Sequence, residues 1–303
     1  MRDQAEALRE RMRRLAAETA PERAATSGRS PARVIAVTSG KGGVGKSNVA
    51  LNVALGLARL GKRVVLVDID LGFANLDVLM GVAPRFHLLD LVTRRLSVWD
   101  VLTDGPEGIR FLAGGSGFDR LLSLNEETLR YLFAQLEQLE TAADVVLFDT
   151  AAGLTPHGLR ALLAADDLFL VTTPEPTALT DAYAVVKVLA RQAQDGVDAR
   201  ELSVRLIVNR ARSQREGKEA ARRLVAVAQR FLNLPIAVLG CVPEDEHVRR
   251  AVTSQRPLLV AYPHAPAARE LARIARTVVG GDGARARQPG GIRRFLQRLV
   301  PWI

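Results

Sequence analysis

A glycine-rich stretch at residues 40–47, Gly-Lys-Gly-Gly-Val-Gly-Lys-Ser, constrains this chain more than any other part of its sequence. It fits the pattern GxxxxGK[ST] and stands between a β-branched run at residues 34–38 and an apolar helical pattern that stops at Gly61. Glycines let consecutive backbone N–H groups turn toward phosphate oxygens, and the start of the following helix adds a positive dipole. The stretch therefore predicts a site for the phosphates of a nucleotide.

Three side chains in and beyond this loop suit a nucleotide with its metal ion. Lys46 is expected to bridge the β- and γ-phosphates, and the Ser47 hydroxyl to ligate Mg²⁺. Residues 145–148 form an apolar run that ends on Asp149, the form of a Walker B element that holds the metal, usually through a water. ATP and Mg²⁺ are the predicted cofactors. The predicted phosphate loop consists of Gly40, Lys41, Gly42, Gly43, Val44, Gly45, Lys46, Ser47 and Asn48.

A second apolar run, residues 64–67, ends on Asp68 and is followed by Asp70. These carboxylates could hold the metal's outer shell and the attacking water. They could equally cap a helix or form a turn. Their position at a strand end favours a role in the site, because ligands of open α/β sheets bind at the carboxyl ends of the strands.

Apolar strand patterns alternate with helical patterns through the centre of the chain, which predicts an α/β fold: a doubly wound, mostly parallel sheet with helices on both faces. We expect an N-terminal helix and linker at residues 1–32, an ATPase domain at 33–280, and a basic linker with an amphipathic helix at 281–303. Further strands are predicted at residues 109–113, 145–148, 168–172, 202–208 and 236–240, and helices at 126–140, 180–193, 218–232 and 266–278.

Composition excludes several classes of protein. A single cysteine, Cys241, leaves neither an internal disulfide nor a CxxC pair for zinc or a cluster. No apolar run approaches the length of a membrane span, and the charged N-terminus does not resemble a signal peptide, so a cytoplasmic location is expected. The net charge of +9 permits a nucleic-acid partner, but much of the excess lies in the tail, and we expect no such partner.

The motifs SGKGGVGKSNVALNVA, VVLVDIDLGFANLDVLMG and VVLFDTAAG together resemble the MinD/ParA group of deviant Walker A ATPases over residues 33–279. In that group Lys41 matches a signature lysine that reaches the partner's phosphates in an ATP-sandwiched homodimer. The resemblance implies that Asp70 orients the hydrolytic water with support from Asp68, and that Asn75 and residues 149–153 form the two switches. It also implies a base pocket made by Asn209, Pro243 and Glu244.

The end of the chain, GIRRFLQRLVPWI, carries an apolar stripe opposite arginines at helical spacing. Such a helix suits the headgroup layer of an anionic membrane, and the alternative is a helix docked on the protein's own core. The glycine-rich linker before it favours the membrane, which places the protein peripherally on the cytoplasmic face of the inner membrane. The predicted membrane residues are Ile292, Phe295, Leu296, Leu299, Val300 and Trp302.

The start of the chain, Asp3-Gln4-Ala5-Glu6-Ala7-Leu8-Arg9, resembles the DQAxxLR element of flagellar FlhG/FleN-type ATPases. PEPTALTDAYAVVKVL resembles a stretch of the same subfamily. In that subfamily the element engages FlhF, a GTPase of the signal-recognition-particle type, and stimulates it; the residues carried over are Asp3, Gln4, Ala5, Leu8 and Arg9. The resemblance implies control of flagellar number and placement, with C-ring proteins or a transcriptional activator as further partners.

Two other functions fit part of the pattern. A DNA-segregation ATPase of the ParA type would use the net positive charge but has no need of an apolar tail. A division-site ATPase of the MinD type shares the tail but gives no reason for residues 1–32.

Overall fold

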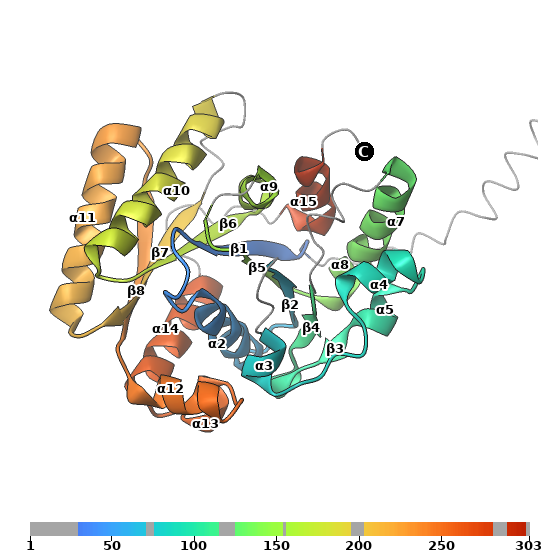
Figure 1. Ribbon diagram of the computed structural model, residues 1–303, viewed down its shortest axis with the longest axis horizontal. Coiled ribbons are helices and arrows are strands. Elements are labelled where there is room, and N and C mark those ends of the chain that lie inside the picture. The colour runs from blue at the N-terminus through green and yellow to red at the C-terminus, as the bar shows by residue number, and fades with distance from the viewer. Residues whose placement is uncertain are drawn as a thin grey trace, which may run out of the picture. The chain divides into compact units, whose positions relative to one another are not determined.

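The computed structural model describes residues 30–70, 76–114, 125–153, 156–194, 203–280 and 290–300. Helices lie on both faces of a central sheet (Figure 1), as the sequence predicts. The eight strands run in the order β3-β4-β2-β5-β1-β6-β7-β8, and every neighbouring pair is parallel except β3 with β4. Their bounds are β1 Arg33–Ser39, β2 Val64–Ile69, β3 Thr103–Asp104, β4 Arg110–Leu112, β5 Val145–Thr150, β6 Asp167–Thr172, β7 Val204–Ala211 and β8 Ile236–Pro243.

Each central strand is apolar on both sides because it separates two hydrophobic cores. In β1, Val34 and Ala36 enter one core, and Ile35 and Val37 enter the other. The first core is covered by α4 (Leu88–Thr93), α5 (Val98–Val101), α7 (Glu126–Glu137), α8 (Leu139–Ala142), α9 (Pro156–Ala164), α10 (Pro176–Gln194), α11 (Gln214–Leu232) and α15 (Gly291–Leu299). The second is covered mainly by α2 (Lys46–Arg59), α3 (Leu76–Met80), α12 (Glu246–Thr253), α13 (Leu258–Ala261) and α14 (Pro266–Gly280).

The strands and long helices predicted within residues 33–280 are all present, with ends shifted by a few residues, whereas the predicted N-terminal helix lies outside the described residues. Sequence patterns did not predict the short elements α3, α4, α5, α12 and α13, the helix α9, or the two-residue edge strand β3. Most of these have too few turns to display a helical period. Among the residues that the structure describes, no helix is long and apolar enough to cross a membrane.

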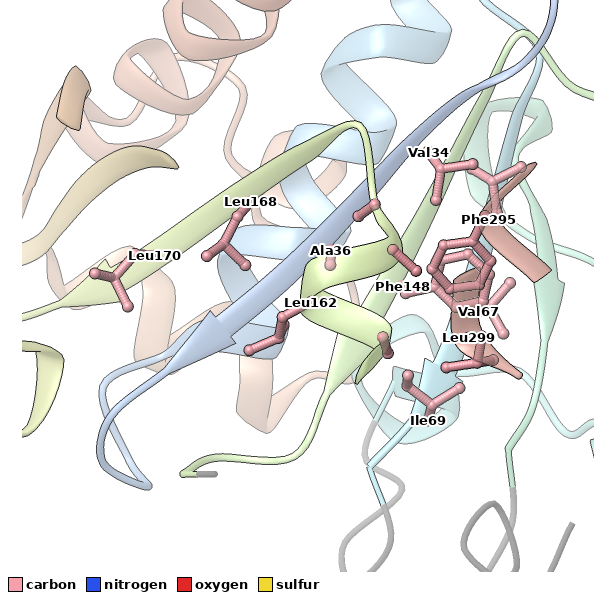
Figure 2. Close-up of a cluster of buried hydrophobic side chains, with 14 of the residues drawn as sticks. Val34, Ala36, Val67, Ile69, Phe148, Leu162, Leu168, Leu170, Phe295 and Leu299 are labelled. Atoms are coloured by element: carbon pink, nitrogen blue, oxygen red, sulfur yellow. The ribbon is translucent and has the colours of Figure 1, made fainter. Parts of the chain in front are cut away.

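The C-terminal helix α15 lies where the sequence analysis did not favour it. The helix lies on the sheet between α7 and α9 (Figure 1), and its apolar stripe faces the core rather than solvent. Figure 2 shows the ring of Phe295 against that of Phe148 on β5, with ring centroids 4.6 Å apart. The buried stripe comprises Ile292, Phe295, Leu296, Leu299 and Val300, each no more than 2% exposed.

In this conformation the stripe is docked on the protein's own core, the alternative that the sequence analysis did not favour, and membrane binding stays a prediction. An apolar stripe is matched equally well by lipid and by a protein core, so the pattern did not distinguish the two surroundings. Trp302, the remaining predicted membrane residue, lies outside the described residues.

Candidate nucleotide site

The glycine-rich loop joins β1 to α2 at the carboxyl edge of the sheet. β1 lies between β5 and β6, at the point where the strand order reverses, which is where open α/β sheets bind their ligands. Gly45 takes a left-handed conformation with φ +87° immediately before α2 begins at Lys46. A side chain at Gly40 would collide with the backbone of α10 at Asp181, so the loop is seated tightly on that helix.

Lys46 lies at the centre of a buried carboxylate cluster. Its Nζ lies 2.5 Å from Asp149 Oδ1 and 3.5 Å from Asp70 Oδ2, and its side chain is only 7% exposed. Asp68 on β2 is the register partner of Asp149 on the neighbouring strand β5. The Asp68 Oδ1 accepts a hydrogen bond from the Asp70 backbone N–H. The structure thus brings together the four side chains that the sequence predicted at strand ends and in the loop.

Burial dominates the protonation of this cluster. It raises the pKa of Asp68 from 3.8 to about 7, and the nearby charge of Asp149 adds to the effect. Burial also raises the pKa of Asp149, against the opposing charge and hydrogen bond of Lys46. Asp70 and Asp149 share Lys46 as their positive partner, so this cluster of carboxylates favours the binding of a further cation.

The residues fit a magnesium ion with its phosphate ligands. Asp149 Oδ2 has no hydrogen-bond partner, and the residue is buried, with only 1% of its surface exposed. A buried polar atom without a partner is costly, and a metal ion or its bound water would satisfy it. Ser47 would supply the second protein oxygen, and its hydroxyl lies 3.4 Å from Lys46 Nζ. When bound, the metal would neutralise charge on the β- and γ-phosphate oxygens.

Lys41 points away from this cluster, in contrast to Lys46. Its side chain is 44% exposed and lies on the start of α10, with Nζ 3.3 Å from the Thr177 hydroxyl and 3.7 Å from Glu175. The two lysines of the loop therefore have different surroundings: Lys46 is buried among carboxylates and Lys41 lies at the surface.

A cavity of about 490 Å³ opens beside the loop, within the range of about 300–1,000 Å³ that is typical of small-molecule sites. It is lined by Asn48, Asn209, Pro243 and Glu244, the residues that the resemblance assigned to the loop end and the base pocket. Asn209 also fixes the loop, because its side-chain amide donates a 2.8 Å hydrogen bond to the Val44 carbonyl. The sequence analysis missed Val49, Arg210, Val242, Asp245, Glu246, Val248, Arg249 and Leu271, which also line this cavity.

Two groups of predicted residues cannot be placed in this site. Asn75, expected in the first switch, lies outside the described residues, as do Asp3, Gln4, Ala5, Leu8 and Arg9 of the proposed GTPase contact. Of the residues implied for the second switch, 149–153 are described and continue directly from β5, with Gly153 in a left-handed conformation.

Comparison with known proteins bears on this geometry. Residues 35–258 match the family described as the CobQ/CobB/MinD/ParA nucleotide binding domain. The chain belongs to this family. The match contains most of β1, the glycine-rich loop, both aspartate-bearing strands and every residue that lines the cavity except Leu271, so the resemblance seen in the sequence is confirmed.

Three relatives illustrate this membership. The chain is 39% identical to "Antiactivator FleN" of Pseudomonas aeruginosa, covering 89% of this chain and 94% of that protein. It is 30% identical to "Flagellum site-determining protein YlxH" of Helicobacter pylori, covering 89% and 90% respectively. A solved structure of the septum site-determining protein MinD of Pyrococcus horikoshii with Mg-ADP superposes with a TM-score of 0.65 at 28% identity, covering 82% of this chain and 98% of that chain.

The raised pKa of Asp68 predicts a stability that depends on pH. Since folding raises this pKa from 3.8 to about 7, the buried group destabilises the nucleotide-free fold increasingly as the pH rises through that range. Asp68→Asn should therefore increase the free energy of unfolding by about 2 kcal/mol more at pH 8 than at pH 5.5. Urea unfolding at the two pH values measures this difference.

The matched control is Asp104→Asn, which changes an exposed carboxylate on β3. It should alter the unfolding free energy equally at both pH values. An Asp68→Asn variant whose effect is the same at pH 5.5 and pH 8 would show that Asp68 is already ionised in the folded protein.

Proposed function

We propose that this protein is an ATP-dependent, dimerising MinD-like ATPase that regulates flagellar number and placement. The observation that carries the proposal is the pair of lysines in one loop, with Lys46 buried among the carboxylates and Lys41 exposed at the surface. A lysine that serves the nucleotide of its own chain needs to lie inside the site. One that lies outside is available to a second copy.

The exposed lysine suits a dimer in which each chain completes the other's site. Within the part of the chain that the structure describes, the Lys41 side chain is restrained by surface contacts with Glu175 and Thr177, and surface ion pairs contribute little stability. Moving it onto the phosphates of a partner would therefore cost little. The negative phosphates of ATP would bind both lysines of a site, the buried one of the same chain and the exposed one of the second copy. The dimer would therefore depend on the γ-phosphate.

Hydrolysis would follow from positioning and charge neutralisation. Asp70 lies 3.5 Å from Lys46, beside the place where the loop would hold the γ-phosphate, and is suited to orient a water for attack on phosphorus. The bond between the γ-phosphorus and the bridging oxygen breaks, which yields ADP and phosphate. Mg²⁺ held by Ser47 and Asp149 would neutralise the charge that develops on the leaving oxygen.

Strand β5 connects this site to the tail helix. Asp149 forms an ion pair with Lys46, and the residue before it, Phe148, stacks on Phe295 of α15. We propose that phosphate binding draws Lys46 from Asp149, shifts the end of β5 and loosens α15. The freed stripe would then bind an anionic membrane surface, with two tails per dimer acting together.

Docking of α15 is weak enough for such a change. Burying five apolar side chains contributes roughly 10 kcal/mol, and ordering the backbone of its nine residues costs about as much. Because the two quantities nearly cancel, a modest shift at Phe148 is sufficient to change the position of the helix.

The membrane location proposed here is peripheral, on the cytoplasmic face.

The flagellar assignment comes from the relatives and from the two ends of the chain. FleN is named an antiactivator and YlxH a flagellum site-determining protein, and both match nine-tenths of this sequence. C-ring proteins or a transcriptional activator are the partners we propose beyond the GTPase. Division-site MinD proteins also match, at 31% identity in Helicobacter pylori, and remain the alternative function, with ParA-type DNA segregation as a second.

The N-terminal element gives a test of the flagellar assignment. A peptide of residues 1–20 should stimulate GTP hydrolysis by the cognate FlhF-type GTPase, with Gln4 placed near the GTPase site. Phosphate release measured with and without the peptide checks this, and a peptide with Gln4→Ala is the control. A wild-type peptide without effect would leave a division-site function as the better assignment.

The two lysines should separate binding from dimerisation. Lys46→Ala should lower ATP affinity at least tenfold, because the buried ammonium contacts the phosphates of its own chain. Lys41→Ala should bind ATP normally but stay monomeric. Titration with a fluorescent ATP analogue and light scattering after size exclusion measure the two properties.

An arrested variant completes this experiment. Asp70→Ala should bind ATP, fail to hydrolyse it and accumulate as a dimer. If Asp70→Ala is monomeric in saturating ATP, or if Lys41→Ala dimerises like the wild type, the proposed role of the corresponding residue is incorrect.

A further inference from the structure

Two carboxylates at the amino edge of the sheet, on the far side from the nucleotide site, each bind two separate parts of the chain. Glu140 on α8 accepts from the Ala32 amide at 2.7 Å through one oxygen and from the Ile292 amide at 2.7 Å through the other. Asp166, just before β6, accepts from Val34 and from Gly290, both at 2.9 Å. The segment that leads into β1 and the start of α15 thus share both acids.

We propose that Glu140 and Asp166 form a latch that holds α15 on the domain and couples its position to the segment at residues 31–34. That segment is where the chain enters the domain from its N-terminal region. Each acid bonds both segments at once, one through each oxygen, so movement of one segment is expected to shift the shared carboxylate and weaken its hydrogen bond to the other.

Two glycines at the start of α15, Gly290 and Gly291, allow the close approach of both acids. Gly291 has φ +78°, and a Cβ there would lie 2.9 Å and 3.2 Å from the two Glu140 carboxylate oxygens. A Cβ on Gly290 would lie 2.9 Å from Asp166 Oδ1. Sequence analysis assigned these glycines to a flexible linker, whereas the structure uses them for close approach to the acids.

The latch is chemically suited to selective release. Hydrogen bonds from backbone amides to a carboxylate are charge-assisted and stronger than those between neutral groups. The β1 segment keeps further bonds if the latch is lost, because the Arg33 amide donates to the Asp144 carbonyl and β1 pairs with β5 and β6. The start of α15 takes part in none of the strand pairings of the described sheet, so it is the segment expected to leave.

An amide in place of each acid tests the latch without changing its size. A glutamine or asparagine has a single acceptor oxygen, and its NH₂ group would face a backbone N–H. Glu140→Gln and Asp166→Asn can therefore serve only one of the two segments. In the full chain without nucleotide or membrane, each should speed hydrogen exchange of the α15 amides about tenfold or more while the central strands keep their protection.

The matched control is Glu137→Gln, which also faces α15 but pairs with Arg293 at 4.0 Å on the surface. It should change α15 exchange less than about twofold. The reverse direction uses Leu299→Ala, which loosens α15 about two helical turns beyond the latch. If the segments are coupled, this variant should speed exchange at Ala32 and Val34 although it touches neither acid.

Each outcome decides the proposal. Faster α15 exchange in both acid variants, together with faster exchange at Ala32 and Val34 in Leu299→Ala, supports it. Wild-type exchange in α15, or exchange no faster than in Glu137→Gln, overturns the latch. Should an acid variant fail to fold, Leu299→Ala decides alone, and unchanged exchange at Ala32 and Val34 overturns the coupling. Because no membrane, GTPase or ATP is used, the result is independent of the proposed function.

Discussion

The ion pair between Lys46 and Asp149 is the interaction on which the rest of this structure depends. Both side chains are almost fully buried, with Nζ and Oδ1 2.5 Å apart, and a buried charge without a partner is strongly destabilising. The pair allows the charged Lys46 side chain to stay buried while no nucleotide is bound. We propose that bound phosphates replace Asp149 as the partner of Lys46, which would leave Asp149, already lacking one hydrogen bond, to a metal ion.

Strand β5 is shared between two processes that we propose are linked. Asp149 lies near the carboxyl end of this strand and Phe148 faces the core beneath α15, so the proposed metal site and the tail meet on adjacent residues. At the other edge, Glu140 and Asp166 hold the same helix by its first amides. The position of α15 is thus set by one contact near the nucleotide site and by two acids far from it.

The sequence was sufficient to predict the fold class, the phosphate loop and the aspartates at strand ends. These features depend on neighbours along the chain: glycines that permit the loop, and a carboxylate that directly follows an apolar strand. Patterns of this kind remain visible without three-dimensional information.

Other features depended on contacts between distant residues. The apolar stripe of α15 suits lipid and protein equally, and only the structure shows Phe295 on Phe148. Leu271 lines the base cavity from α14, although nothing near it in the sequence resembles a nucleotide contact. Glu140 accepts hydrogen bonds from the backbone amides of Ala32 and Ile292, each more than a hundred positions away along the chain. No local sequence pattern predicts such contacts.

The central claim is that ATP, through the dimer, moves α15 from the protein core to a membrane. Sedimentation of the full chain with anionic vesicles, without nucleotide, with Mg-ADP and with Mg-ATP, tests it most directly. The account predicts pelleting with Mg-ATP alone, and its loss when residues 291–303 are deleted. Equal pelleting in all three states would contradict it, as would retention on DNA in Mg-ATP without any binding to vesicles.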